Sequence, residues 1–368
     1  MKKILTVLGA RPQVIKSAAI TRVILTDFSH QLEEVVVNTG QHYDSNMNDV
    51  FFEELFLPSP KYNQSIDLKK PFIINQMILG IEDAIHIENP DFILVYGDTN
   101  STLAGAISAV KSQIPLVHVE AGLRSFKLSM PEEGNRILTD HSSRFLFSPT
   151  LEGVRNLLNE SINRSHVYHC GDIMLDNSLF YFDKAKNTST ILSDLKLVKE
   201  NYILLTCHRP SNTDSKDNLY QIFDALKKIS KKTSKKIVFP IHPRTKKQIL
   251  KFFGEEYFDL ELCDFLLLPP ASYLDIIMLV SNADFIITDS GGIQKEAYFF
   301  KKKSLLLREE TEWVEIVKNN AAILVGSDSD RIIKGYHKIK IINPSFPSLF
   351  GDGKAGRFIC KTILNDCA

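Results

Sequence analysis

Short, continuous apolar runs recur along the first half of the chain, with longer segments between them. The runs that we interpret as strands are Ile4–Leu8, Glu34–Asn38, Phe92–Tyr96, Leu116–Val119 and Phe145–Phe147. Runs without polar alternation are typical of parallel strands that are covered on both faces. Between them, 76–87 and 103–111 place apolar residues at helical spacing. This alternation predicts a doubly wound parallel sheet in an α/β fold.

The same alternation restarts near residue 200. Strands are expected at 202–206, 236–240, 265–268, 285–288, 304–307 and 322–325, and helices at 217–231, 272–281 and 293–300. The polar, helical segment 171–199 suits a connector. Because 368 residues exceed what one core usually holds, we expect two α/β domains of similar size, 1–172 and 173–350, and a last segment 351–368.

Composition narrows the class of protein. Lys+Arg and Asp+Glu both number 44, and this balance argues against nucleic-acid binding. No apolar stretch approaches the ~20 residues that span a bilayer, so no membrane segment is expected. The five cysteines form no CxxC pair and are interpreted as reduced thiols of a cytoplasmic protein. No cluster of His, Cys and Asp has metal-ligand spacing, so we expect no metal.

The first expected strand is followed at once by a turn with two cations. Pro12 suits the first turn of a helix, where its missing N–H costs nothing. Arg11 and Lys16 would then stand at the carboxyl end of the sheet, where open α/β folds bind ligands. Two cations beside a helix N-terminus predict an anion site, and a turn with surface charges is the alternative.

A second candidate anion site follows the strand at 285–288. Ser290, Gly291 and Gly292 separate this strand from a helix, and such a turn exposes backbone N–H groups to a phosphate. Glu296, about one helical turn later, is placed to accept hydrogen bonds from a ribose diol. The alternative is a tight turn capped by Ser290. The chain has no GxGxxG fingerprint and no Walker A loop, which disfavours NAD and ATP.

Three acidic positions follow successive strands of the first half. Asp98 and Glu120 stand just after their strands, and Glu132 lies in the run PEEGNR, which also carries Arg136. Each one alone has a structural explanation, such as Asp98 capping a helix. Because parallel strands end at one edge of their sheet, we expect the three carboxylates to converge, and together they predict acid/base chemistry.

The first strands of the second half end in basic residues. His208 and Arg209 follow the strand at 202–206 and would clamp a diphosphate held at the glycine turn, while His242 ends the next strand with weaker specificity. A structural histidine is the alternative for His208. Nothing near Cys207 favours a thiolate, so this thiol is not predicted to be a nucleophile.

An ordered set of motifs between residues 9 and 313 carries a family resemblance. The set comprises GARPQVIK, TGQHYD, GDTNSTLA, HVEAGLRS, PEEGNR, HRP, DSGGIQKEA and LREETEW. Together these motifs resemble those of the non-hydrolysing UDP-N-acetylglucosamine 2-epimerases. The resemblance covers nearly the whole chain, although GARPQ stands where many members have GTRPE.

The resemblance implies a fold and a reaction. The implied fold has two Rossmann-like domains of the glycosyltransferase-B type with a cleft between them, and a C-terminal helix that crosses back to the first domain. A homodimer without a cofactor is also implied. In the implied reaction, UDP leaves to give a 2-acetamidoglucal and then adds back, with a proton delivered to the opposite face of C2. Positive groups would stabilise the departing diphosphate.

The motifs and the resemblance together give a set of site residues. The catalytic candidates are Asp98, Glu120, Glu132, His208 and Lys16. The candidates for binding UDP and the sugar are Arg11, Arg136, Arg209, His242, Ser290, Gly291, Gly292, Glu296 and Arg308. Gln41 and His42 resemble part of the site where some bacterial members bind UDP-N-acetylglucosamine as an activator, although the residues after them differ.

Several alternatives stay open from the sequence. The forms GARPQ, QKEAYFF and LREETEWVE also resemble a branch of the family that acts on UDP-2,3-diacetamido-glucuronic acid. A glycosyltransferase of the same fold, a hydrolysing epimerase that releases UDP, and a catalytically silent UDP-sugar sensor are alternatives of other kinds. The resemblance implies surface polysaccharide synthesis as the pathway.

Overall fold

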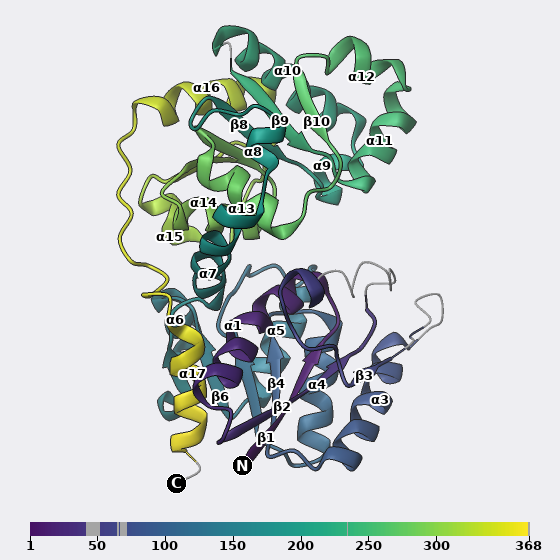
Figure 1. Cartoon of the computed structure of the whole chain (residues 1–368), viewed down its shortest axis with the longest axis vertical. Helices are drawn as coiled ribbons and strands as arrows, with labels where there is room; N and C mark the ends of the chain where they lie inside the picture. The colour runs from purple at the N-terminus through teal and green to yellow at the C-terminus, as the bar shows by residue number, and fades with distance from the viewer. Residues whose placement is uncertain (42–51, 65, 67–71, 234, 367–368) are drawn as a thin grey trace. The chain divides into compact units, whose positions relative to one another are not determined.

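The computed structural model describes residues 1–41, 52–64, 66, 72–233 and 235–366. The chain forms two compact units, which Figure 1 shows in one view. Unit 1 contains Met1–Asn177 and Ser348–Ala368, and unit 2 contains Ser178–Pro347. The first boundary falls inside α7 (Ile173–Thr188), so one helix begins in unit 1 and ends in unit 2.

Unit 1 is built on a seven-stranded parallel sheet with the order β3-β2-β1-β4-β5-β6-β7. Its strands are β1 (Lys2–Leu8), β2 (Leu32–Asn38), β3 (Tyr62–Asn63), β4 (Phe92–Tyr96), β5 (Leu116–Val119), β6 (Phe145–Ser148) and β7 (Val167–His169). The central strands are buried along nearly their whole length, which explains their unbroken apolar sequence.

Helices cover the sheet of unit 1. They are α1 (Arg11–Asp27), α3 (Ile73–Glu88), α4 (Asn100–Lys111), α5 (Pro131–Ser142), α6 (Leu151–Asn159) and α17 (Ala355–Asn365), with a short 3-10 helix at Arg164–His166. Apolar side chains of α3 and α4 share one buried core with β1, β2 and β4.

The last helix belongs to unit 1, although it is the end of the chain. Figure 1 shows α17, in yellow, beside α1, in purple. A side chain on Gly356 would meet the carbonyl oxygen of Ala19 at 3.1 Å, so the backbones of the two helices approach closely. The Asp176 carboxylate accepts hydrogen bonds from the N–H groups of Ala355 (3.1 Å) and Gly356 (2.8 Å), at the start of α17.

Unit 2 is built on a six-stranded parallel sheet with the order β10-β9-β8-β11-β12-β13. Its strands are β8 (Tyr202–Thr206), β9 (Lys236–Pro240), β10 (Phe265–Leu268), β11 (Phe285–Thr288), β12 (Lys303–Leu306) and β13 (Ala322–Leu324). Two separate apolar cores contain residues from these strands.

The helices of unit 2 precede, connect or follow these strands. They are α8 (Ile191–Asp194), α9 (Pro210–Thr213), α10 (Lys216–Thr233), α11 (Pro243–Phe253), α12 (Glu256–Glu261), α13 (Tyr273–Asn282), α14 (Gly291–Phe299), α15 (Val314–Lys318) and α16 (Ser329–Ile341). Among the helices in the described part of the chain, none is long and apolar enough to cross a membrane.

The prediction of two Rossmann-like, doubly wound units is confirmed. Each expected strand is present to within two residues of its expected ends, and the helices expected at 76–87, 103–111 and 217–231 lie inside longer ones. Strands β3 and β7 were not predicted, because two or three residues carry too little pattern. In both sheets the strand order reverses beside the first strand, between β1 and β4 in unit 1 and between β8 and β11 in unit 2.

Candidate active site

The reversal of strand order determines where a ligand binds in such a sheet. At that point two neighbouring connections leave in opposite directions, and a crevice opens at the carboxyl ends of the strands. In unit 1 the turns that follow β1 and β4 carry Arg11 and Asp98. In unit 2 the turns that follow β8 and β11 carry His208 and Ser290. Predicted site residues therefore stand at the equivalent point of both sheets.

The turn between β1 and α1 is fixed by Gln13, a buried residue that the sequence did not single out. Its Oε1 accepts hydrogen bonds from the N–H groups of Gly9 (2.9 Å) and Ala10 (3.1 Å). Its Nε2 donates to the Tyr96 carbonyl (2.9 Å) and to Thr102 Oγ1 (3.0 Å). This one amide ties the start of α1, where Arg11 stands half-buried, to the end of β4 and the first turn of α4.

Lys16 and Glu120 meet at the carboxyl edge of the sheet of unit 1. Lys16 Nζ lies 2.7 Å from Glu120 Oε1, and both side chains are largely shielded from solvent. A side chain on Gly97 would lie 3.1 Å from Lys16 Nζ and 3.7 Å from Glu120 Oε1, which places the turn after β4 against the same pair. Glu120 has φ +75°, a left-handed backbone that costs a non-glycine residue about 1–3 kcal/mol.

Asp98 joins this group from the end of β4. It forms an ion pair with Arg136 on α5. Burial raises the pKa of Asp98 above its ordinary value, against the nearby charges of Arg136 and Lys16, and the carboxylates of Glu120 and Glu132 raise it further. The Asp98 side chain is 23% exposed to solvent. Asp98, Glu120, Lys16 and Arg136 therefore form one electrostatic cluster in unit 1.

The two neighbouring acids of α5 differ in their surroundings. Glu132 is exposed, and its charge acts on Asp98. Glu133 is buried and accepts hydrogen bonds from the N–H groups of Ser125 (2.9 Å) and Phe126 (2.8 Å). These bonds outweigh the effect of burial and lower the pKa of Glu133. Glu133 thus holds the loop before α5, and Glu132 is the acid of this pair that faces solvent.

Gln41 lies beside the same edge of unit 1. Its Oε1 accepts hydrogen bonds from the N–H (3.1 Å) and the Oγ (2.7 Å) of Ser101, in the first turn of α4. Ser101 Oγ also lies where a side chain on Gly9 would stand. Ser101 therefore contacts both Gln41 and the turn that follows β1. His42, which was singled out with Gln41, lies outside the described residues.

In unit 2, the loop that carries His208 and Arg209 is fixed by Asp289. This carboxylate is fully buried and accepts hydrogen bonds from the N–H groups of His208 (2.9 Å) and Arg209 (2.8 Å), and from Asn212 Nδ2 (3.1 Å). His208 Nδ1 also lies 3.3 Å from the carboxylate. The sequence analysis assigns no role to Asp289 within its motif, and the structure shows that it fixes this loop.

The glycine turn starts α14 at the end of β11. Ser290 is the N-cap, and its Oγ accepts from the N–H of Ile293 (3.4 Å). A side chain on Gly292 would meet only Ser290 Oγ, at 3.7 Å, so the space above Gly292 is open. A side chain on Gly291 would collide with the Glu312 carboxylate and lie 3.5 Å from Trp313 Nε1. The first turn of α14 is therefore open on the side of Gly292 and closed by Glu312 on the side of Gly291.

Arg308 approaches this turn through Glu312. Arg308 Nη2 lies 2.8 Å from Glu312 Oε2, and the Arg308 side chain is 8% exposed. Burial opposes ionisation of Glu312, but the charge and hydrogen bond of Arg308, and the charge of Arg209, lower its pKa. Because Glu312 responds to both guanidinium groups, Arg308 and Arg209 lie near the same carboxylate.

Two further candidate residues of unit 2 differ in exposure: Glu296 is buried and His242 is exposed. Glu296 is buried on α14, close enough to Tyr273 for its charge to help raise the pKa of that phenol, after burial. His242 is exposed at the N-terminus of α11, where its Nδ1 accepts from the N–H of Arg244 (3.1 Å), and its ring lies 5.4 Å from that of His208. Burial also raises the pKa of the Cys207 thiol, which disfavours a thiolate there.

Comparison with known proteins decides the family. The sequence model of the family described as UDP-N-acetylglucosamine 2-epimerase matches residues 26–364. The chain belongs to this family. The resemblance that the motifs carry is thus confirmed, and as a UDP-N-acetylglucosamine 2-epimerase family member the chain is an enzyme of the isomerase class.

Relatives in this epimerase family match over their whole length. A UDP-N-acetylglucosamine 2-epimerase homolog of Methanococcus maripaludis is 44% identical over 99% of each chain. The UDP-2,3-diacetamido-2,3-dideoxy-D-glucuronate 2-epimerase of Pseudomonas aeruginosa is 42% identical over 98% of this chain and 99% of the relative. The crystal structure of Methanocaldococcus jannaschii UDP-GlcNAc 2-epimerase in complex with UDP-GlcNAc and UDP is 38% identical, with a TM-score of 0.89 over 99% of each chain.

This family member also contains a buried polar network that the sequence did not predict. His118 is fully buried on β5, with Nδ1 2.7 Å from Asp140 Oδ1 and Nε2 2.8 Å from the Gly97 carbonyl. Asp140 Oδ2 accepts hydrogen bonds from the N–H of Gly122 (3.1 Å) and from Arg124 Nη1 (2.7 Å). One signal was available, because a histidine inside an otherwise apolar buried strand must find polar partners.

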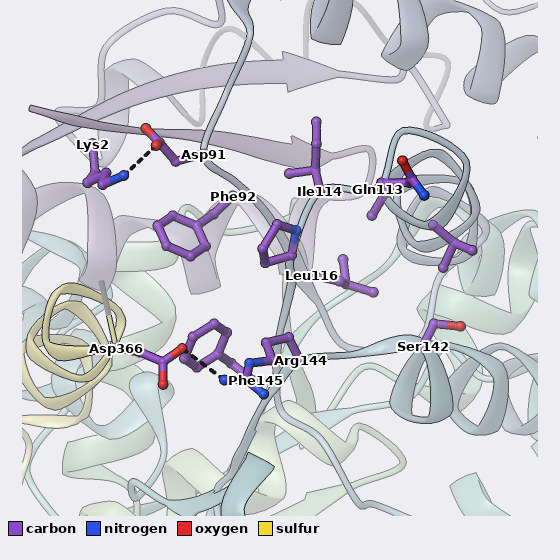
Figure 2. Close-up of a pocket in the computed structure, with 13 residues that line it drawn as sticks. Lys2, Asp91, Phe92, Gln113, Ile114, Leu116, Ser142, Arg144, Phe145 and Asp366 are labelled. Atoms are coloured by element: carbon purple, nitrogen blue, oxygen red, sulfur yellow. Dashed lines mark hydrogen bonds and ion pairs between the residues drawn. The ribbon is translucent and has the colours of Figure 1, made fainter. Parts of the chain in front are cut away.

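A pocket of about 530 Å³ lies elsewhere on unit 1 of this epimerase. Figure 2 shows it beside Phe92, Leu116 and Phe145, at the amino ends of β4, β5 and β6. Ion pairs of Lys2 with Asp91 (2.8 Å) and of Arg144 with Asp366 (3.3 Å) lie within it. The pocket is at the opposite edge of the sheet from the predicted catalytic residues and contains none of them. Across the residues with described positions, no three His, Cys, Asp or Glu side chains are grouped to hold a metal ion.

Proposed function

We propose that the chain interconverts UDP-N-acetylglucosamine and UDP-N-acetylmannosamine by inverting C2 of the sugar. The observation that carries this proposal is the cluster of Asp98 and Glu120 with Lys16 and Arg136 in unit 1. Two carboxylates with different surroundings suit a reaction that removes a proton from one face of a carbon and delivers one to the other. The family and the M. jannaschii complex with UDP-GlcNAc and UDP support the substrate class.

The proposed reaction has two steps. In the first, the C2 proton passes to a carboxylate, the C–H electrons form a C1–C2 double bond, and the C1–O bond breaks with its electrons leaving on UDP. In the second, UDP adds back to C1 and a proton reaches the opposite face of C2. Asp98 and Glu120 divide the two proton transfers, and the raised pKa of Asp98 suits a group that must both hold and release a proton. Glu132 adjusts that pKa through its charge, and Lys16 holds Glu120.

Unit 2 binds UDP in this proposal. The open first turn of α14 presents backbone N–H groups of Gly291 and Gly292 to the diphosphate, with Ser290 Oγ beside them. His208 and Arg209, held by Asp289, add positive charge, with Arg308 behind Glu312. Glu296 binds the ribose. In the same proposal, Arg11 and Arg136 of unit 1 and the exposed His242 bind substrate, and Gln41 with His42 binds an activator.

The second candidate substrate is UDP-2,3-diacetamido-glucuronic acid. The 42% identity to the P. aeruginosa enzyme that is named for this sugar favours it as the alternative. Both substrates share the UDP group and the C2 chemistry, so the choice between them changes the sugar pocket and leaves the mechanism unchanged.

Proton NMR in D2O tests the reaction and the substrate together. The purified protein is mixed with UDP-N-acetylglucosamine, without metal or nicotinamide. We expect UDP-N-acetylmannosamine to form and deuterium to enter C2. No change with this substrate, followed by turnover of the diacetamido-glucuronic acid nucleotide, would move the chain to the second candidate. Stoichiometric free UDP would instead indicate a hydrolysing enzyme, and tight binding without turnover a sensor.

We also propose that the enzyme works as a cytoplasmic homodimer in surface polysaccharide synthesis. Exposed apolar side chains on unit 1 support self-association, namely Leu79 and Ile87 on α3 and Val110 on α4, which are 62%, 66% and 57% exposed. Light scattering coupled to size-exclusion chromatography measures the mass in solution. A monomer at micromolar concentration would contradict the dimer.

A further inference from the structure

His118 lies beneath the turns that carry the two proposed catalytic carboxylates. Its ring is fully buried, and each ring nitrogen is within hydrogen-bond distance of an oxygen. The Gly97 carbonyl, 2.8 Å from Nε2, can only accept a hydrogen bond. Nε2 must therefore carry a proton.

The second nitrogen faces a carboxylate, whose charge decides the state of the ring. Asp140 Oδ2 already accepts from the Gly122 N–H and from Arg124 Nη1, and Oδ1 lies 2.7 Å from His118 Nδ1. The permanently charged guanidinium of Arg124 and the Gly122 N–H therefore hold Asp140 as an anion, whatever the state of the ring. Asp140 is thus an acceptor on both oxygens, and Nδ1 must also carry a proton.

The charged groups next to the ring extend from the buried Asp140 to the partly exposed Glu160. Arg124 donates from Nε and Nη2 to the two oxygens of Glu160, at 2.6 and 2.7 Å. Glu160 is 27% exposed and also lies 3.2 Å from the exposed His141, so solvent screens its charge. A cationic His118 therefore adds to the shielded ion pair of Arg124 with Asp140, and the Glu160 carboxylate beyond Arg124 supplies a second negative charge.

The same network holds the backbone from which Asp98 and Glu120 project. The Gly97 carbonyl, bonded to His118, immediately precedes Asp98. The Gly122 N–H, bonded to Asp140, lies two residues after Glu120. Glu120 itself has φ +75°, a conformation that persists only where its surroundings enforce it. A small displacement of either turn would misplace a proton-transfer group, for which about 1 Å can cost about a hundredfold in rate.

We propose that His118 is a positioning residue that works as a buried imidazolium, joining the turn of Asp98 to the turn of Glu120 through Asp140. The role rests on the proposed function, since it concerns the placement of these two carboxylates. His118 touches no reacting atom in this proposal. Its protons are held by Gly97 and Asp140 and take no part in the transfer at C2.

Two substitutions of His118 each keep one of its two hydrogen bonds and remove the other. In His118→Gln the amide nitrogen reaches the position of Nε2 and keeps the bond to Gly97, whereas in His118→Asn it replaces Nδ1 and keeps the bond to Asp140. We expect each variant to slow deuterium entry at C2 by about ten- to a hundredfold. Affinity for UDP, which the proposal assigns to unit 2, should stay within about twofold in a calorimetric titration, since unit 2 is untouched. His86→Gln, an exposed histidine on α3, is the matched control and should behave as the wild type.

Nitrogen NMR of the wild-type protein with labelled histidine tests the ring directly and needs no variant to fold. At the pH of the activity measurement, both ring nitrogens of His118 should carry protons, and Asp140→Asn should convert the ring to a neutral tautomer. A neutral ring in the wild type, or His118→Gln and His118→Asn exchanging deuterium at the wild-type rate, would overturn the inference. If the wild type itself exchanges no deuterium with either sugar nucleotide, the proposed function fails, while the NMR signal still reports the state of the ring.

Discussion

The two units place an aspartate at the same point of the same kind of sheet and use it in opposite ways. Asp98 follows β4 and Asp289 follows β11, and each of these strands lies next to the first strand of its sheet. Asp98 keeps 23% exposure and pairs with a side chain, Arg136. Asp289 is fully buried, and its oxygens accept two backbone N–H groups and one side-chain amide.

The difference shows that position at the edge of the sheet does not by itself make a carboxylate catalytic. A fully buried carboxylate that is occupied by structural hydrogen-bond donors is not accessible to a substrate. A carboxylate that is partly exposed, with a raised pKa, can exchange a proton with one. In the proposed mechanism, unit 1 presents acid/base groups at its switch point, whereas unit 2 uses its aspartate to shape a loop and binds the anion at a glycine turn.

Among the substitutions that distinguish the two units, we expect Asp98→Asn to have the largest effect. Asparagine keeps the size of the side chain and loses the proton-transfer group, so C2 exchange should fall by about 10²–10⁴-fold. UDP affinity, which the proposal assigns to unit 2, should change little. Stability should fall by less than about 3 kcal/mol, because the largely buried Arg136 loses one partner but keeps its ion pair with Glu133 (3.2 Å). Exchange is measured by NMR, stability by urea unfolding and affinity by calorimetry. A loss of UDP affinity as large as the loss of rate would contradict the assignment.

The same substitution in unit 2, Asp289→Asn, should reverse the pattern. The amide cannot accept all the donors that Asp289 accepts, and its own N–H groups would face those of His208 or Arg209. We expect a loss of about 3 kcal/mol in the free energy of unfolding, since hydrogen bonds to a charged group contribute about 1.5–3 kcal/mol each. Any loss of rate should follow weaker UDP binding. If Asp289→Asn is as stable as the wild type and abolishes exchange, the contrast between the units is wrong.

A third aspartate, Asp176 of unit 1, combines buried N–H partners, as Asp289 has, with a raised pKa, as Asp98 has. It is buried and accepts two N–H groups from α17, yet burial, helped by Asp172, raises its pKa from 3.8 to about 6 against those hydrogen bonds. Because the pKa is raised in the folded state, the stability from this group is fully present below pH ~4, the unfolded value, and is lost as the pH rises through about 6. The difference of about two pKa units sets an upper limit of about 3 kcal/mol.

Asp176→Asn tests this dependence, because asparagine does not titrate. We expect the stability of the wild type, relative to the variant, to fall by at most about 3 kcal/mol between pH 4 and pH 7 in urea unfolding. The same substitution at Asp183, whose side chain is 76% exposed, is the control and should give a flat difference. A flat difference for Asp176→Asn as well would mean that its pKa is not raised in the folded protein.

The three aspartates also show which features of the site can be predicted from the sequence and which cannot. Strand runs and turn residues were enough to predict both sheets and to place Asp98, Glu120 and Ser290 at their edges. The sequence analysis named Glu132 and not its neighbour Glu133, but no local pattern supports that choice. Two adjacent residues of a helix point in different directions, and which of them faces solvent depends on how the helix is packed. Asp289, Gln13 and Asp140 were missed as organising residues for a different reason. Their partners are backbone groups and side chains up to 89 positions away, and no local pattern records such contacts.

The smallest expected effects separate the two glycines of the turn that starts α14. A side chain on Gly292 meets open space, so Gly292→Ala should leave the fold intact and even stabilise it by about 0.5 kcal/mol, because alanine loses less entropy in a helix. Gly291→Ala instead forces the Glu312 carboxylate to move and should cost about 1 kcal/mol. Thermal unfolding measures both.

The UDP affinities of Gly291→Ala and Gly292→Ala test whether the diphosphate binds at this turn. If the diphosphate occupies the space above Gly292, the methyl group of Gly292→Ala fills it, and affinity should fall by about tenfold although the protein is more stable. Gly291→Ala should weaken binding through the displaced Glu312, together with its loss of stability. If Gly292→Ala binds UDP with the wild-type affinity, the proposal that the diphosphate binds at this turn is wrong. The contrast between the units would then rest on unit 1 alone, because the open glycine turn would be a feature of the fold and not of binding.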